Sequence, residues 1–211
     1  MDELELLKKD WKKNDMQFKQ VSEKEIYSML HKSSSSIVKW IFIISVLEIV
    51  FWTGLSVLTS NDTYWKMLEK YHLKTIMQIL SIINFGVIAY FIYRFYSNYK
   101  KINATDSINQ LLKTIINSRK TVKQYVTYNL AMIALSLILF FGSQAMYEPK
   151  IQDILNKFGT NSSKGYLIVF GSYFLIILVF TIIIWLFYKL IYGLLLRRLN
   201  KNYKELQKID F

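Results

Sequence analysis

The sequence predicts an all-α, polytopic membrane protein in which four transmembrane helices form a bundle. Of its 211 residues, 53% are hydrophobic, a composition closer to that of a small membrane protein than to that of a soluble domain. Four apolar runs of 22 or 23 residues each occupy 37–58, 75–96, 125–146 and 166–188. At about 1.5 Å per residue, each run can cross a hydrocarbon core of roughly 30 Å.

The positions of the basic residues predict the orientation of these spans. Of the 27 Lys and Arg residues, 21 lie in three segments, 1–39, 94–123 and 189–208. The positive-inside rule therefore predicts that both termini and the middle loop are cytoplasmic, with anionic lipids of that leaflet as the first partner. The net charge of +12 comes mainly from these segments, and no nucleic-acid recognition motif accompanies it. We therefore expect no nucleic acid as a partner.

The segment 1–36 is expected to form two short amphipathic cytoplasmic helices that lead into the first span. Leu4, Leu7 and Trp11 fall on one helical face, which makes them candidates for binding a partner. Ser22, followed three residues later by a glutamate, has the spacing of a capping box and predicts the start of the second helix.

The membrane domain, 37–196, includes a cytoplasmic helical loop at 97–124. Thr105 or Ser107 is the expected N-cap of its helix, which carries an apolar stripe over 108–116 and runs on into the third span. In the two outer connections we expect short interfacial helices, the second of which begins at Pro149.

The last segment, 197–211, is expected to form a cytoplasmic helix with an apolar stripe over 199–209. Together with the N-terminal segment and the middle loop, it gives three cytoplasmic segments that each have an apolar face. These faces could cover one another, lie on the membrane surface, or bind a partner protein, and the sequence leaves these alternatives open.

A buried polar cluster around Glu48 is the predicted functional site. Glu48 lies near the middle of the first span, where a charged acid costs roughly 2.5 to 3.5 kcal/mol, so we expect it to face protein. Matching depths between neighbouring helices brings Asn84 and Ser136 to its level. The predicted cluster contains Glu48, Asn84, Ser136, Ser45, Trp52 and Ser81. A hydrogen bond from Glu48 to Asn84 would fix helix register, whereas a functional Glu48 would respond to protons or cations.

The sequence predicts no enzyme, catalytic residue, cofactor or metal site. Cysteine is absent, and the two histidines, His31 and His72, fall on opposite sides of the membrane in the predicted topology. No nucleophile motif or dinucleotide fingerprint is present.

Two family resemblances suggest different functions. A lone glutamate in the first of four membrane helices resembles the small multidrug-resistance transporters, which implies exchange of protons for cations at Glu48. The stretches "LELLKKDWKKND" and "EIYSMLHKSSSSIVKWIFIISVLE", with the four-span layout, resemble four-helix inner-membrane proteins of Bacteroidetes-type bacteria, often encoded beside extracytoplasmic-function sigma factors. This second resemblance implies a membrane regulator that holds a sigma factor at its N-terminal segment.

Our leading expectation is a non-enzymatic, multi-pass protein of the bacterial inner membrane that acts as a regulatory or scaffolding anchor. Its partner would be a cytoplasmic protein such as a sigma factor, and a homo-oligomer is compatible with the same sequence. The alternative is a small proton- or cation-coupled transporter that uses Glu48.

Overall fold

The computed structural model is all-α, as predicted, and describes residues 5, 22–105, 107–157 and 163–209. In this part of the chain, four long helices are apolar enough to cross a membrane, and two short helices connect them in pairs. The four candidate spans indicate a multi-pass membrane protein. The helices are α2 (Glu23–Thr59), α3 (Asp62–Lys70), α4 (Lys74–Asn103), α5 (Ile108–Tyr147), α6 (Pro149–Lys157) and α7 (Ser163–Ile209).

Side-chain caps start two of the long helices at the predicted positions. At the start of α2, the Ser22 hydroxyl accepts a hydrogen bond from the Glu25 amide, and the Glu25 carboxylate accepts one from the Ser22 amide. This confirms the capping box. Ser107, rather than Thr105, is the N-cap of α5 and accepts a hydrogen bond from the Gln110 amide. From there α5 continues without a break through the third apolar run, as expected.

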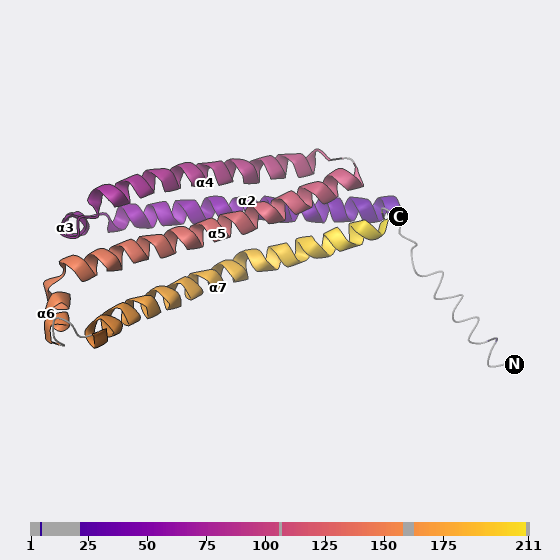
Figure 1. Cartoon of the computed structure of the whole chain (residues 1–211). Helices are drawn as coiled ribbons and strands as arrows, with labels where there is room; N and C mark the ends of the chain where they lie inside the picture. Colours follow the sequence, from indigo (N-terminus) through magenta and orange to yellow (C-terminus); the bar gives the residue numbers. More distant parts are fainter. Residues whose placement is uncertain (1–4, 6–21, 106, 158–162, 210–211) are drawn as a thin grey trace.

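The two short helices predicted in the first and third connections between the spans are confirmed as α3 and α6. Asn61 caps α3 by accepting a hydrogen bond of 2.9 Å from the Tyr64 amide. Pro149 is the first residue of α6, a position where its missing N–H has no cost. Both helices lie at the same end of the bundle (Figure 1), which we call the short-helix end.

The four long helices form a ring in which consecutive members run in opposite directions (Figure 1). Helix α2 packs against α4 and α7, and α5 packs against the same two helices from the diagonal position. At the end opposite α3 and α6, the C-terminal end of α7 lies beside the start of α2, near the α4–α5 connection (Figure 1). We call this the basic end, because most Lys and Arg residues lie in these segments.

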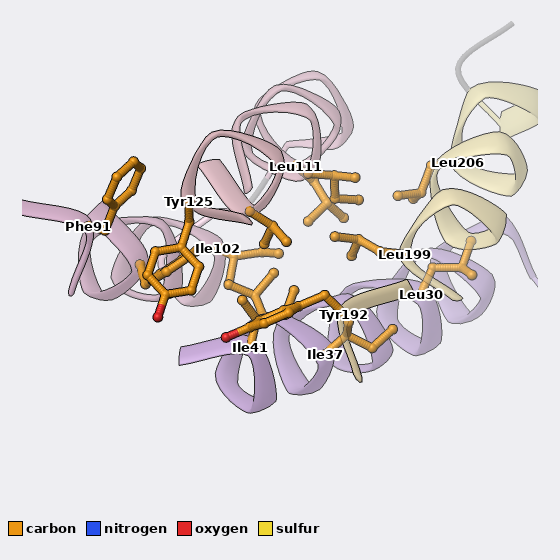
Figure 2. Close-up of a cluster of buried hydrophobic side chains, with 14 of the residues drawn as sticks. Leu30, Ile37, Ile41, Phe91, Ile102, Leu111, Tyr125, Tyr192, Leu199 and Leu206 are labelled. Carbon is orange, nitrogen blue, oxygen red and sulfur yellow. The ribbon is translucent and has the colours of Figure 1, made fainter. Parts of the chain in front are cut away.

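The best-packed core lies toward the basic end (Figure 2). Five of its side chains are completely buried: Ile102, Leu111, Ile115, Leu199 and Leu206. Residues of the stripes predicted over 108–116 and 199–209 therefore pack into one cluster, although Ile116 remains 46% exposed. Leu4, Leu7 and Trp11 lie outside the described residues.

The first apolar run contributes to the same core. Ile37, Val38 and Ile41, at the start of this run, pack with residues of the 97–124 loop and of the C-terminal segment. Toward the short-helix end the long helices instead expose large apolar side chains, with exposed fractions of 82% for Leu58 and 74% for Leu167. Such a surface suits contact with lipid.

Polar contacts tie the C-terminal part of α7 to the start of α2. The Asn202 side-chain amide donates to the hydroxyls of Ser33 at 2.9 Å and Ser34 at 3.1 Å. Ser34 is completely buried, so this contact satisfies a hydroxyl that water does not reach.

Candidate functional site

Glu48 binds two tyrosines of α7. The hydroxyl of Tyr192 donates a hydrogen bond of 2.9 Å to one carboxylate oxygen of Glu48, and the hydroxyl of Tyr188 donates to the other. The two tyrosines are four residues apart, so they project from one face of α7. The contact links α2 to α7 through both oxygens of a single acid.

Tyr125 of α5 completes an aromatic group beside this acid. Its ring centroid lies 6.4 Å from that of Tyr188 and 6.1 Å from that of Tyr192. Phe91 of α4 packs edge-on against Tyr125 at 5.5 Å. Figure 2 shows Phe91, Tyr125 and Tyr192 at the end of the buried cluster away from Leu206. Rings from three helices therefore fix the tyrosines around Glu48.

A cavity of about 420 Å³ lies beside Glu48 and is lined by α2, α4, α5, α7 and Tyr64 of α3. Five of the six residues of the predicted cluster line it: Glu48, Asn84, Ser136, Trp52 and Ser81. Ser45 is not among the lining residues; its side chain is buried and donates to the Phe42 carbonyl of its own helix at 2.7 Å. Trp52 is 42% exposed, so it lies at the margin of the bundle.

Glu48 and Asn84 do not form the expected hydrogen bond. The Glu48 carboxylate is bound by the two tyrosine hydroxyls, and the buried Oδ1 of Asn84 has no hydrogen-bond partner among the described residues. Asn129 also lines the cavity, and its side-chain amide donates to the Tyr125 carbonyl at 2.9 Å. Glu48 and the two amide side chains of Asn84 and Asn129 therefore come from three helices that line the same cavity.

The tyrosines were not predicted from the sequence, because depth matching misplaced Glu48 along the bundle axis. Tyr188 is the last residue of the predicted fourth span and Tyr125 is the first of the third. Their contacts place Glu48 level with the basic-end boundary of these spans rather than with their middle. One signal in the sequence could have identified the tyrosines. A buried carboxylate needs hydrogen-bond donors, and Tyr188 and Tyr192 offer two hydroxyls from one helical face.

A second titratable cluster lies at the short-helix end. The Lys70 ammonium is 2.5 Å from a carboxylate oxygen of Glu148, and the Tyr71 hydroxyl donates to the same oxygen at 2.6 Å. The hydrogen bond from Lys70, followed by that from Tyr71, lowers the pKa of Glu148 below its ordinary 4.5. The same contacts raise the pKa of Lys70 and that of Tyr71. This cluster joins the turn after α3 to the end of α5.

Acidification should weaken this joint. Because the pKa of Glu148 is lower in the folded state than in the unfolded state, its stabilisation is present above about pH 4.5 and is lost as the pH falls through the folded value. We expect the melting temperature of the detergent-solubilised wild type to fall more between pH 5 and pH 3 than that of Glu148→Gln. Circular dichroism would measure both. The matched control, Asp153→Asn in exposed α6, should keep the wild-type slope. Equal slopes for all three proteins would contradict this prediction.

The histidines lie at opposite ends of the described structure. The His31 Nε2 is 2.7 Å from the carbonyl oxygen of Ile102 near the basic end, whereas the His72 ring packs against Tyr147 at the short-helix end, 4.6 Å between centroids. Within the described ranges, no group of three or more His, Asp and Glu residues is placed to hold a metal ion.

Comparison with known proteins identifies a family. Residues 24–211 match the family described as Domain of unknown function (DUF8845). This match covers the four candidate spans, except Glu23 at the start of the first, and the residues that line the Glu48 cavity. Neither a curated protein nor a solved structure matches the chain significantly. The chain therefore belongs to the family of the domain of unknown function DUF8845.

Proposed function

We propose that this chain is a small proton- or cation-coupled membrane transporter in which Glu48 is the cation-binding group. The observation that carries the proposal is that the acid Glu48 lines a cavity inside the bundle together with polar residues of two other long helices, Asn84 and Ser136. A carboxylate beside a partly open cavity favours a positively charged occupant, and acids within membrane domains often mark proton or ion pathways.

The rest of the cavity suits an organic cation. Aromatic side chains of Trp52, Phe85 and Phe180 line it, and ring faces attract cations. Its volume of about 420 Å³ falls in the usual range for small-molecule sites. Glu48 is the one acid among the lining residues that the structure describes, so a proton and a cation would compete for the same carboxylate. When neither is bound, the hydroxyls of Tyr188 and Tyr192 stabilise the charge.

Carbodiimide labelling tests this competition directly. Dicyclohexylcarbodiimide is an apolar reagent that reacts with protonated carboxyl groups, so we expect it to label Glu48 and to label it less as the pH rises. Tetraethylammonium, used as a probe cation, should protect Glu48 from the reagent. Labelling would be located and quantified by mass spectrometry of the purified chain in detergent. Glu48→Gln should remove the label, and Glu148→Gln, which lies at the short-helix end, should leave it unchanged.

Absence of Glu48 labelling at every pH would contradict the proposal and leave the acid a purely structural acceptor for two tyrosines. In proteoliposomes, a tetraethylammonium gradient should also drive protons across the membrane with the wild-type chain and not with Glu48→Gln. Equal proton movement with both proteins would contradict a coupling function for this residue.

The docking function expected from the N-terminal segment depends on Leu4, Leu7 and Trp11, which lie outside the described residues. The two other apolar stripes give it less support, because their described residues pack mainly into the internal core. The Glu48 cavity is therefore the better-supported basis for a function.

A further inference from the structure

A second hollow, a groove of about 660 Å³, lies between α5 and α7 toward the basic end. Its basic lining residues are Arg119, Lys120, Lys123 and Lys189, and its apolar lining residues include Val126, Leu130 and Trp185. Because α5 and α7 run in opposite directions, the cations of both helices lie nearer the basic end than these apolar side chains do. The groove is thus basic along its middle, with Val126, Leu130 and Trp185 on the side toward the short-helix end, while Ile116 and Leu196 line it on the other side.

The positive charges in this groove have no acidic partner in the described part of the chain. The ion pairs found there involve Lys70, Lys74 and Lys201 instead. No Asp or Glu is among the groove's lining residues. The Lys189 ammonium lies 4.6 Å from the centroid of the Trp185 ring, a contact that orients the side chain but does not neutralise its charge. Four neighbouring cations therefore lack a counter-ion among the residues that the structure describes.

The arrangement of charge matches one class of ligand. A phospholipid with an anionic headgroup would place its phosphate among the cations and an acyl chain along the apolar part of the groove. Basic pockets between transmembrane helices bind such headgroups on the cytoplasmic side, where the sequence places this end of the bundle. A free phosphate ion would bind the cations without contacting Val126, Leu130 or Trp185.

We propose that the groove between α5 and α7 is a binding site for an anionic phospholipid, with Arg119, Lys123 and Lys189 binding its phosphate. Glu48 does not line this groove, so the site does not depend on the proposed transport function. Tyr188 lines both the groove and the Glu48 cavity, and Tyr192, which lines the groove, binds Glu48 through its hydroxyl. A lipid in the groove would therefore touch the side chains that bind Glu48.

Native mass spectrometry of the full chain in detergent, titrated with phosphatidylglycerol, tests the proposal. We expect the wild type to bind one phosphatidylglycerol more tightly than phosphatidylcholine. The triple variant Arg119→Gln/Lys123→Gln/Lys189→Gln should bind phosphatidylglycerol on the order of 10- to 100-fold more weakly, given the usual contribution of each basic residue near an anionic membrane. A control with the same charge loss, Lys100→Gln/Lys101→Gln/Arg197→Gln, alters exposed residues that do not line the groove and should keep the wild-type affinity.

Three results would overturn the proposal. Equal weakening in both triple variants would mean that net charge alone attracts the lipid. Equal binding of phosphatidylcholine would mean that the headgroup charge is not recognised, and displacement of the lipid by millimolar inorganic phosphate would identify a site for the free ion. Lys189→Gln alone changes an exposed side chain, so it tests the same site with little risk to the fold and should weaken binding several-fold.

Discussion

Replacing Ile115 by alanine should lower the free energy of unfolding by about 2 to 5 kcal/mol, the usual range for truncating a buried aliphatic side chain. Ile115 lies on α5 in the core at the basic end and is completely buried. Removing most of its side chain leaves a cavity among packed residues such as Leu111 and Leu199. Chemical unfolding in detergent, followed by circular dichroism, would measure the change.

The next residue in the chain provides the control. Ile116 lies on the same helix but is 46% exposed, so Ile116→Ala should change the free energy of unfolding by less than about 1 kcal/mol. If Ile115→Ala and Ile116→Ala have the same effect, the core at the basic end is not packed as the structure shows.

Replacing Glu48 by alanine should also destabilise the protein, by about 2 to 5 kcal/mol, because two buried hydroxyls lose their acceptor. Tyr188 is 4% exposed and Tyr192 is 1% exposed, so both side chains are buried. Each unsatisfied buried polar group costs about 1 to 3 kcal/mol. The same chemical unfolding experiment measures this effect, and Glu48→Gln, which keeps one acceptor oxygen, should lose less.

A double-mutant cycle separates this contact from the simple loss of side-chain volume. In the background Tyr188→Phe/Tyr192→Phe, which has no hydroxyls to satisfy, Glu48→Ala should cost less than in the wild type by about 0.5 to 3 kcal/mol. An identical cost in both backgrounds would show that the tyrosine–glutamate hydrogen bonds do not stabilise the fold.

The helices could be predicted because their signals are local. Each helix can be recognised from residues that are neighbours in the chain. The signals are a long apolar run, a serine with a glutamate three residues later, and a proline at the first position of α6. The structure accordingly has α2 beginning after Ser22, α5 after Ser107 and α6 at Pro149.

The partners of Glu48 could not be predicted in the same way, because they depend on how far one helix is shifted along another. Hydropathy marks residues that avoid water, whether lipid or protein covers them. Hydropathy assigns Ile37 and Ile41 to the start of the first predicted span. In the structure they pack in one cluster with Leu199, which lies beyond the end of the fourth predicted span. The assumption that all four runs end at one level therefore did not bring Tyr188 to the depth of Glu48, whose cavity Asn84 also lines.

The unbroken course of α7 limits how this protein can move. One uninterrupted helix carries both Tyr192 and Leu206. Tyr192 binds Glu48, and Leu206 is completely buried in the core at the basic end. Proline is the commonest cause of a sharp helix kink, and none occurs in α7. A rigid-body rotation of α7 that withdraws the tyrosines from Glu48 must therefore also rotate Leu206. A change at the Glu48 cavity would then alter the packing of the core at the basic end.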